Sequence, residues 1–380
     1  MIHMSRRVAL VLAAGVFAGF AACGPLAAQT PEPIRIGAIL STTGPGAGAG
    51  IPQRNGLQLA VKLVNEKGGI DGRQVQLILE DDGSSPDIAV TKANNLIFSQ
   101  KVQAIIGPTL TASTLAVGGI ADPVKIPVMA FTGLGVPLEK TRRCVFHMLP
   151  SQDLNARALL EVATKALGVK TLGVLHDSAY GNIVMTKLKE VSPDYPVKIV
   201  AVEKWEVGAT DVTTQAAKMK AAAPDAVAII GNSATPFRNA RQIRLTAPLL
   251  SALGTATYEY VKAMGDAADN IVFAEFLVAE DPLPNQTAFV EAFRAQYSVL
   301  PKTMEASAWD AFNAVAAALA TLGPDPKPGA LCEAIRRPFE GAMARFDFSQ
   351  EDLTGLTLNS YVFSKLDKGQ FIRLPFKAGS

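Results

Sequence analysis

The region that begins at residue 34 alternates between apolar strands and amphipathic helices. Ile34–Leu40 is an apolar run that enters a loop of Ser, Thr and Gly, and Gln53–Glu66 carries apolar residues at helical spacing. A Gly-Gly turn and a second strand that ends in acids, Val75–Glu80, come next. This order predicts a parallel βαβ unit, and open α/β sheets bind ligands at the carboxyl ends of their strands.

The alternation continues and then starts afresh near Thr171, which predicts a second sheet of the same α/β architecture and a cleft between the two. Further strands are predicted at Ala104–Ile106, Val128–Phe131, Thr171–Leu175, Val197–Val202, Ala226–Ile230, Leu249–Ala252 and Ile271–Phe276. Further helices are predicted at Pro86–Ser99, Ala112–Ala121, Gln152–Leu167, Asn182–Val191, Val212–Ala221, Ala234–Leu245, Gln286–Tyr297, Glu305–Leu322 and Gly329–Arg337. Cys144–Pro150 is interpreted as an apolar crossover, and Phe346–Phe376 as hairpin strands with a turn at 367–369.

Length and charge limit the classes of function. With 380 residues the chain is too long for one ordinary core, so two domains are expected. Hydrophobic residues make up 49% and charged residues 18% of the chain, which indicates a globular protein. The net charge of +2 offers no reason to expect binding to nucleic acid or to an anionic membrane.

The N-terminus is typical of an export signal. Arg6 and Arg7 precede the apolar run Val8–Ala22, and the small residues up to Ala28 provide a cleavage site. We therefore expect residues 1–28 to be a signal peptide and the mature protein to be periplasmic. A retained anchor is the less favoured alternative, because the apolar run is shorter than a bilayer span. A lipid-modified Cys23 is less favoured as well, because Phe20 fits that signal poorly.

Two cysteines remain after such cleavage, Cys144 and Cys332. In an oxidising compartment they form either one disulfide or two buried free thiols, and the sequence leaves both alternatives open.

Candidate catalytic, metal and cofactor sites are weak. His176-Asp177 lacks the other residues of a catalytic relay, and the acids of Glu80–Asp82 are interpreted as a solvated strand end. The glycines of Gly44–Gly50 miss the dinucleotide-binding spacing, so this segment is expected to be an open, flexible loop at the rim of the cleft. We therefore expect no catalytic residue, no metal and no cofactor.

The stronger candidate is the segment Gly107–Thr114, which follows a strand and opens a helix. Its hydroxyl groups, among them those of Thr109 and Thr111, stand where backbone amides lack partners, and such a helix start holds a carboxylate. Ordinary helix capping is the alternative. The loop that begins at Thr132 lies on the same sheet edge, and Tyr180 is expected to cover the mouth of the cleft from the second lobe.

Several segments together resemble the leucine/isoleucine/valine-binding family of extracytoplasmic solute-binding proteins, which serve ABC importers. They are IGAILSTTGP, NGLQLAVKLVNEKGGIDGRQVQLILEDDGSSP, IIGPTLTAS, IPVMAFT and HDSAYG. The resemblance implies two Rossmann-like lobes joined by three crossovers, which close like a hinge around a ligand. Lobe 1 would comprise 34–149 plus 278–342, and lobe 2 would comprise 150–277 plus 343–380. It also implies a monomer that binds a small carboxylated solute and delivers it to a membrane permease.

The family's binding residues carry over in part. Thr111 keeps the hydroxyl that holds the ligand carboxylate, whereas Leu134, Ala49 and Ser233 replace residues that usually bear a hydroxyl or a ring. No acid stands near Thr255, where the family pairs the ligand's ammonium group. The resemblance implies a site made of Ala49, Thr109, Thr111, Ala112, Thr132, Gly133, Leu134, Tyr180, Ser233 and Thr255.

These departures lead to the hypothesis of a carboxylate ligand with a larger apolar or aromatic body and no amine. A branched-chain amino acid stays an alternative, because Asp177, Asp211 or Glu259 could reach the site. A ligand sensor of the same fold and an exported α/β enzyme are the remaining alternatives.

Overall fold

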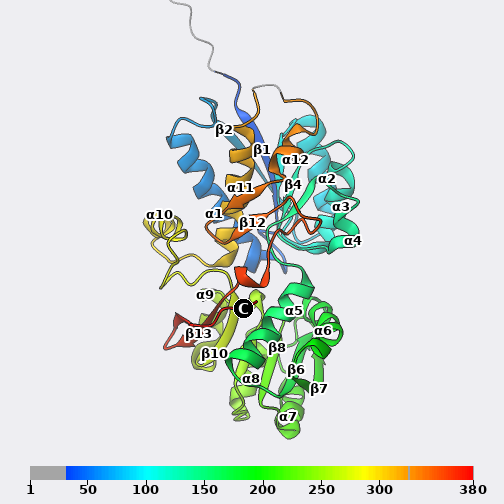
Figure 1. Cartoon of the computed structure of the whole chain (residues 1–380), viewed down its shortest axis with the longest axis vertical. Helices are drawn as coiled ribbons and strands as arrows, with labels where there is room; N and C mark the ends of the chain where they lie inside the picture. The colour runs from blue at the N-terminus through cyan, green and yellow to red at the C-terminus, as the bar shows by residue number, and fades with distance from the viewer. Residues whose placement is uncertain (1–30, 324–325, 380) are drawn as a thin grey trace, which may run out of the picture. The chain divides into compact units, whose positions relative to one another are not determined.

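A computed structural model describes residues 31–323 and 326–379 of the chain. The expected signal peptide and Cys23 therefore lie outside the described residues. Residues from Glu32 onward form a compact unit that contains two main sheets, and we name the part around the first sheet lobe 1 and the part around the second lobe 2 (Figure 1).

The sheet of lobe 1 is entirely parallel, as predicted. Its strand order is β2-β1-β3-β4-β5, and β1 starts in register with β2, with Ile34 beside Val75. The strands are β1 (Ile34–Leu40), β2 (Val75–Asp81), β3 (Ala104–Ile106), β4 (Val128–Ala130) and β5 (Val145–His147). The carboxyl ends of all five strands point toward lobe 2, so the loops that follow the strands lie together at this edge of the sheet.

Helices cover both faces of this sheet because its strands are apolar on both sides. Helices α1 (Ala47–Glu66) and α11 (Thr303–Leu319) pack together on one face, and α2 (Pro86–Asn94) and α3 (Thr111–Ala121) pack together on the other (Figure 1). Smaller elements complete the lobe: η1 (Asn95–Ser99), which continues α2, α4 (Val136–Glu139), α10 (Thr287–Tyr297) and α12 (Ala330–Ile335).

The sheet of lobe 2 has the order β14-β13-β10-β9-β8-β6-β7. Its parallel strands are β6 (Thr171–Asp177), β7 (Lys198–Trp205), β8 (Ala226–Ile230), β9 (Leu249–Ser251) and β10 (Ile271–Glu275). The tail adds β13 (Val362–Asp367), which pairs antiparallel with β10, and β14 (Gln370–Arg373), which pairs antiparallel with β13. The predicted hairpin is thus confirmed, and this edge of the sheet is mixed because a two-residue turn joins only antiparallel strands.

Helices again cover both faces. Helices α5 (Gln152–Glu161) and α6 (Tyr180–Val191) pack together on one face, and α7 (Thr213–Ala222) and α8 (Thr235–Gln242) pack on the other. The shorter helical elements are η2 (Val162–Ala166), η3 (Ser192–Asp194), η4 (Leu253–Thr255), α9 (Tyr258–Met264), η5 (Gly265–Ala268) and η6 (Leu358–Ser360).

Two local predictions are wrong. The glycine-rich segment Gly44–Gly50 is not an open loop throughout, because α1 already begins at Ala47. A Cβ atom on Gly50 would lie 2.0 Å from the carbonyl oxygen of Ser41, so glycine lets the helix start against the end of β1. The apolar stretch from Cys144 to Pro150 is not only a crossover, because its residues 145–147 form β5.

The third expected lobe boundary, between residues 342 and 343, falls inside a small hairpin. Its strands β11 (Pro338–Glu340) and β12 (Arg345–Asp347) pair with each other, and the ring of Phe348 lies 5.5 Å from that of Phe146 in lobe 1. These contacts favour a later crossover, between residues 348 and 362.

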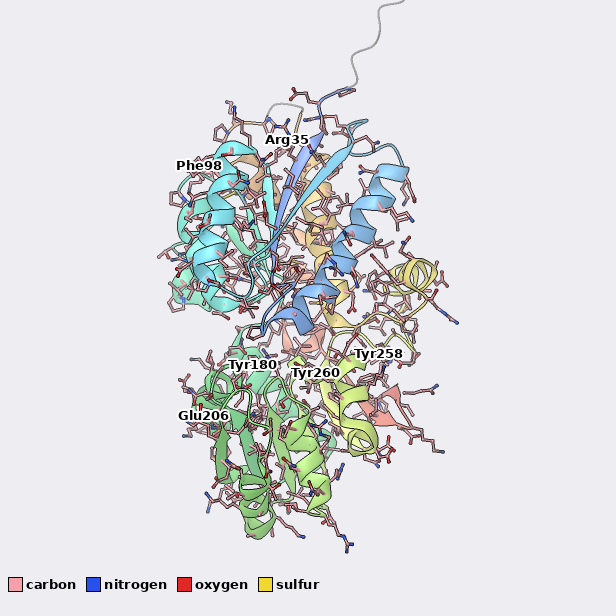
Figure 2. The ribbon with its side chains drawn as sticks, turned by 180° about the vertical axis from the view of Figure 1, so that it is seen from behind. Arg35, Phe98, Tyr180, Glu206, Tyr258 and Tyr260 are labelled. Atoms are coloured by element: carbon pink, nitrogen blue, oxygen red, sulfur yellow. A yellow bond between two sulfur atoms is a disulfide. The ribbon has the colours of Figure 1, made fainter. Side chains whose placement is uncertain are left out.

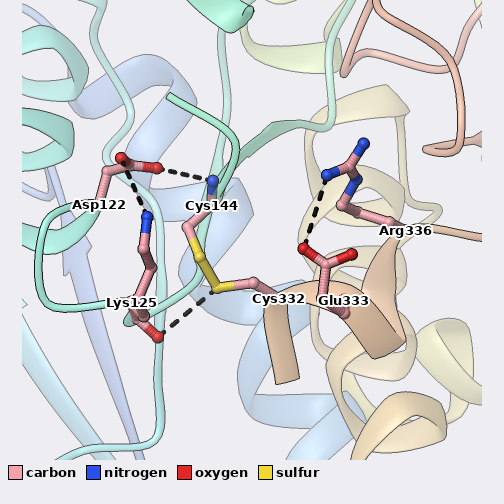
Figure 3. The surroundings of a disulfide bond; sticks show 6 residues. All are labelled: Asp122, Lys125, Cys144, Cys332, Glu333 and Arg336. Atoms are coloured by element: carbon pink, nitrogen blue, oxygen red, sulfur yellow. Dashed lines mark hydrogen bonds and ion pairs between the residues drawn. A yellow bond between two sulfur atoms is a disulfide. The ribbon is translucent and has the colours of Figure 1, made fainter. Parts of the chain in front are cut away.

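A disulfide joins Cys144 and Cys332, which confirms the first of the two alternatives for the cysteines (Figure 3). Their Cα atoms lie 5.3 Å apart, and the amide of Cys144 donates a 2.8 Å hydrogen bond to the Asp122 carboxylate. The bond ties α12 to the segment that precedes β5, so it cross-links parts of lobe 1 that are 188 residues apart in the chain.

Candidate functional site

A cavity lies where the carboxyl ends of the strands of both lobes meet, and it measures about 950 Å³ with its open mouth. Figure 2 shows Tyr180 and Tyr260 at this level of the molecule. The polar lining residues are Gln53, Thr109, Thr111, Thr132, Gln152, Asn155, Tyr180, Asn232, Thr257 and Tyr260. The others are Pro45, Gly46, Gly48, Ala49, Leu110, Phe131, Leu149, Pro150, Leu253, Gly254 and Met304.

This lining is neutral. Every polar residue in it carries a hydroxyl or an amide, and none carries a charge. The remaining lining is apolar, with Phe131, Leu149 and Met304 as its bulkiest members. The cavity therefore suits a small molecule that has a polar end and an apolar body.

Helix α3 presents its N-terminus to the cavity. Within the described part of the chain, nothing accepts a hydrogen bond from the amides of Thr111 and Ala112, and the hydroxyl of Thr111 lies 2.9 Å from that of Thr132. The hydroxyl of Thr109 is already used, because it donates to Gln53 and accepts from the amide of Ser41. Thr109 thus holds the loop in place, and the next turn offers free donors.

Three more helices begin at the cavity. Ala49 of α1, Gln152 of α5 and Tyr180 of α6 are lining residues in the first turns of their helices. The first turns of α1, α3 and α6 hold no acidic residue that would neutralise the positive ends of the helix dipoles. Together these N-termini favour a negatively charged group in the cavity.

Tyr180 contributes a phenol to the same space. Burial, and next the nearby Asp177 carboxylate, raise the pKa of Tyr180, so the hydroxyl stays protonated near neutral pH. The residue stands close to β8 because its neighbour Gly181 has no side chain; a Cβ atom there would lie 2.1 Å from the carbonyl oxygen of Ile230.

The acids that the sequence left as possible amine partners do not line the cavity. Asp177 accepts hydrogen bonds from the amides of Ala179 and Gly181, at 2.9 and 2.7 Å. Asp211 accepts a 2.8 Å hydrogen bond from the Thr213 amide before α7, and Glu259 is exposed.

Two acids at the end of β2 support a loop, and the prediction of a solvated strand end is wrong for the buried Asp82. Asp82 is fully buried and accepts from the hydroxyls of Ser41 and Ser113. Asp81 accepts from the amide and the hydroxyl of Thr43. Among the described residues, no group of His, Cys, Asp and Glu side chains could hold a metal ion. Nor does any described helix combine the length and the apolar character that a membrane span requires.

Five of the ten residues predicted for the site line the cavity, namely Ala49, Thr109, Thr111, Thr132 and Tyr180. Ala112 is exposed and offers its amide.

The other four lie outside the lining, because each is engaged elsewhere. Gly133 packs against Ser151, and the amide of Leu134 donates to Glu139. The hydroxyl of Ser233 accepts from the Thr235 amide, and the hydroxyl of Thr255 contacts that of Ser251.

Sequence reasoning missed the amide side chains of the site. Gln53 and Gln152 stand at the starts of the helices as the sequence predicted them, which was a usable signal. Asn155 had no such signal, because it is held by the hydroxyl of Tyr361, 206 residues away, at 2.7 Å.

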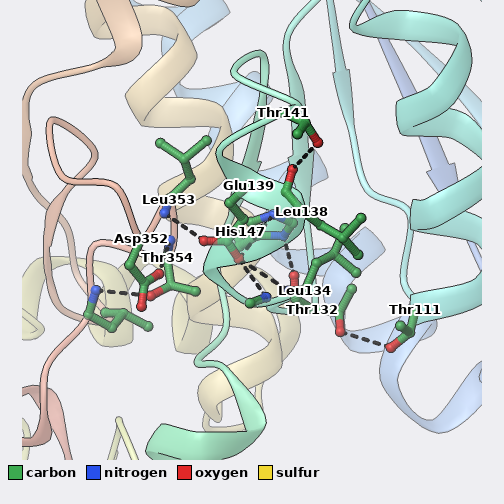
Figure 4. A network of polar contacts seen from close by, with 12 residues as sticks. Thr111, Thr132, Leu134, Leu138, Glu139, Thr141, His147, Asp352, Leu353 and Thr354 are labelled. Atoms are coloured by element: carbon green, nitrogen blue, oxygen red, sulfur yellow. Dashed lines mark hydrogen bonds and ion pairs between the residues drawn. The ribbon is translucent and has the colours of Figure 1, made fainter.

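A buried polar network lies directly behind Thr132 (Figure 4). The ring nitrogen Nδ1 of His147 contacts the carbonyl oxygen of Thr132, and Nε2 lies 3.6 Å from the carboxylate of Glu139 without a hydrogen-bond partner in the described chain. Burial lowers the pKa of His147 to about 4, so the ring is neutral at pH 7. Glu139 also accepts from the amides of Gly135 and Leu353, which links the Thr132 loop to the last crossover.

Comparison with known proteins gives a consistent match over nearly the whole chain. The leucine-, isoleucine-, valine-, threonine-, and alanine-binding protein of Pseudomonas aeruginosa is 26% identical over 370 residues, which cover 95% of this chain and 97% of that protein. The LivJ substrate-binding protein of Streptococcus pneumoniae, solved with isoleucine, is 25% identical with a TM-score of 0.80, over 90% of this chain and 100% of that one.

An extracellular ligand-binding receptor from Rhodopseudomonas palustris HaA2 is 26% identical with a TM-score of 0.80, over 90% of this chain and 99% of that one. The family model described as periplasmic binding protein matches residues 33–370. This chain, with its two α/β lobes, belongs to the periplasmic binding protein family.

Proposed function

We propose that the chain is an extracytoplasmic solute-binding protein of an ABC importer, and that it takes up a small carboxylate-bearing solute in the cavity between its lobes. The observation that carries the proposal is the start of α3, where the amides of Thr111 and Ala112 have no partner among the described residues and lie beside the hydroxyl pair of Thr111 and Thr132. A carboxylate has two oxygens that accept several such hydrogen bonds at once.

The apolar part of the lining gives the rest of the solute its place. Phe131 and Leu149 are mostly buried, and Met304 lies beside the amide of Gln53, whose nitrogen is 3.8 Å from the Met304 sulfur. A branched or aromatic body would displace water from these side chains, which contributes about 25 cal/mol per Å² of apolar surface. The ligand would thus be oriented with its carboxylate toward α3.

Residues of both lobes line the cavity, with Thr111 from lobe 1 and Tyr180 from lobe 2. A solute that contacts both lobes would favour their closed arrangement, and the protein would release the solute when the lobes open again. No covalent step is needed for this cycle. Delivery to a membrane permease then follows from recognition of the closed form.

A branched-chain amino acid is the second candidate, because the Pseudomonas and Streptococcus relatives are named for such ligands. The two candidates differ only in the ligand's amine. Both predict the same position for the carboxylate, so the first experiment need not distinguish them.

Isothermal titration calorimetry of the mature chain against branched and aromatic monocarboxylates tests the proposal. We expect micromolar or tighter binding of at least one compound, and Tyr180→Phe should weaken it about tenfold through the loss of one hydrogen bond. Tyr260→Phe is the matched control with a smaller effect, because the Tyr260 hydroxyl already donates to the carbonyl oxygen of Asn232. If no carboxylate binds below millimolar concentration, the proposal is wrong.

Export is tested separately. Expression of the full chain in a Gram-negative host, followed by osmotic shock, should release a protein whose N-terminal residue is Gln29. A protein that stays in the cytoplasmic fraction and still carries residues 1–28 would contradict this part of the proposal.

A further inference from the structure

Resting on the proposed function, we infer that the solute carries no ammonium group next to its carboxylate, and that an acceptor such as a 2-oxo group takes that position. The inference concerns the same cavity and names the class of its ligand: 2-oxo monocarboxylates with a branched or aromatic body. It stands on two independent observations, the missing anion and the orientation of the amide side chains.

The first observation is that no anionic side chain of residues 31–323 or 326–379 lines the cavity. An amino acid brings an ammonium group, and burying that group without an anionic partner costs several kcal/mol, which corresponds to a hundredfold or greater loss of affinity at about 1.4 kcal/mol per factor of ten. A 2-oxo acid brings the same carboxylate and the same side chain without this cost.

Of three carboxylates close in sequence to lining residues or to α6, two accept hydrogen bonds from the main chain and the third is exposed. Asp177 accepts from two amides at the start of α6. Glu305, next to the lining residue Met304, accepts a 3.0 Å hydrogen bond from the amide of Lys302 and so caps α11. Glu259 is exposed, and it is the one of these three without a described hydrogen bond.

The second observation is that the chain itself uses the acceptor oxygens of three lining amides. The oxygen of Gln53 accepts from Thr109 at 2.7 Å, and that of Asn155 accepts from Tyr361 at 2.7 Å. The oxygen of Gln152 accepts from the amide nitrogen of Asn155 at 3.1 Å.

What these amides present to the cavity is therefore mainly N–H. The NH₂ group of Gln152 has no described partner, that of Gln53 has only the Met304 sulfur at 3.8 Å, and the Tyr180 hydroxyl is a protonated donor. An ammonium group offers three further donors and no acceptor, so it would leave these groups unpaired. A keto oxygen would accept from them.

Matched ligand pairs test the inference, because each pair differs only in the group next to the carboxylate. Calorimetry with the wild-type chain should show that 4-methyl-2-oxopentanoate binds at least about 100-fold more tightly than leucine, and phenylpyruvate more tightly than phenylalanine. Leucine binding as tightly as its oxo acid would overturn the inference and leave the proposed function intact. Absence of binding by all four compounds would overturn the inference, and the proposed function would fall with it only if the wider panel of monocarboxylates also failed to bind.

A charge change at the cavity gives a second measurement. Gln152→Glu keeps the oxygen that accepts from Asn155 and replaces the unpartnered NH₂ group by an anionic oxygen. The added charge repels the carboxylate of both ligands alike, so the ratio of the two dissociation constants isolates the ammonium group. We expect this ratio to shift at least about tenfold toward leucine.

Gln100→Glu is the matched control, because Gln100 is exposed beyond the end of η1 and makes no described side-chain hydrogen bond. In Gln100→Glu the ratio of the two dissociation constants should equal that of the wild type. If Gln152→Glu does not fold, Gln53→Glu serves the same purpose, since Thr109 can still donate to it. An unchanged ratio in the folded variant overturns the inference, as does leucine binding that is lost in Glu259→Gln.

Discussion

The side-chain oxygens of Thr111 and Thr132 lie 2.9 Å apart, although the two residues belong to loops after different strands of lobe 1. Only one hydroxyl of such a pair donates to the other, so one hydrogen stays available at the cavity. We predict that Thr111→Val and Thr132→Val each weaken ligand binding about tenfold or more, because a hydrogen bond to a charged oxygen contributes roughly 1.5–3 kcal/mol.

Calorimetry of the double variant shows whether the two act together. The loss in Thr111→Val/Thr132→Val should be smaller than the sum of the single losses, because each change also disturbs the other hydroxyl. Thr91→Val on the exposed face of α2 is the control and should bind as the wild type does. If Thr111→Val binds the ligand as tightly as the wild type does, the hydroxyl pair does not take part in ligand binding.

The Cys144–Cys332 disulfide should stabilise the fold without affecting binding. It closes a long loop, with a sequence separation of 188, for which the chain-entropy model gives at most about 5 kcal/mol. We expect Cys144→Ala/Cys332→Ala to unfold at lower urea concentration and to keep its affinity, because both residues lie in lobe 1 away from the cavity lining. Calorimetry at a temperature where both proteins are folded checks this, and a changed affinity would contradict it.

His147 should make stability depend on pH. Its pKa is lowered from 6.5 to about 4 in the folded chain, so the unfolded chain binds a proton first as the pH falls. The stability that depends on the neutral ring is complete above pH 6.5 and is lost toward pH 4, a difference of roughly 3 kcal/mol.

Urea unfolding between pH 4.5 and 7.5 measures this effect. The difference in free energy of unfolding between the wild type and His147→Gln should shrink by up to roughly 3 kcal/mol as the pH falls from about 7.5 to about 4.5. Buried acids far from His147, such as Asp310, are common to both proteins and cancel in the comparison. The variant Glu139→Gln, measured alone and together with His147→Gln, accounts for the one acid that lies 3.6 Å from the ring. A difference that does not change with pH would show that His147 is not buried as a neutral ring.

The pair of Lys302 and Glu275 joins the two lobes at a buried position. Lys302 precedes α11, Glu275 ends β10, and the ammonium group also donates to Leu277 at 3.1 Å and lies 3.5 Å from the centre of the Phe371 ring. Lys302→Met should cost about 3–5 kcal/mol, because it leaves a buried carboxylate alone.

Lys302→Met/Glu275→Gln should recover at least half of this loss, since glutamine can still accept from Ser364. Lys140→Met, which breaks the exposed pair with Glu351, should change the free energy of unfolding by less than about 1 kcal/mol. A small loss in Lys302→Met would show that water reaches the pair.

Periodicity was sufficient to predict most strands and helices, because both faces of the parallel sheets are buried and leave apolar runs. It failed where tertiary contacts decide. The start of α1 carries glycines that disfavour a helix in isolation, and its contact with Ser41 is invisible in the local sequence. Strand β5 is three residues long and shows no period.

The site was predictable where it depends on strand ends and helix starts, as at Thr111 and Tyr180. It was not predictable where a partner comes from far along the chain, as for Asn155 and Tyr361. Two of the predicted residues that do not line the cavity share one cause. Ser233 and Thr255 carry hydroxyls at the right strand ends, but neighbours in the same loops satisfy them, and sequence alone does not reveal such local pairing.

The order of the strands along the chain has a consequence for assembly. The parallel core of lobe 2, from β6 to β10, is one uninterrupted segment, whereas lobe 1 needs α11, α12 and Cys332 from beyond it. During synthesis the central strands of lobe 2 can therefore pair before the last helices of lobe 1 have been synthesised. A chain truncated shortly before residue 332 would keep the five parallel strands of lobe 2, but it would lose β13 and β14 with the core residues Leu366 and Phe371, and it would lack the covalent closure of lobe 1.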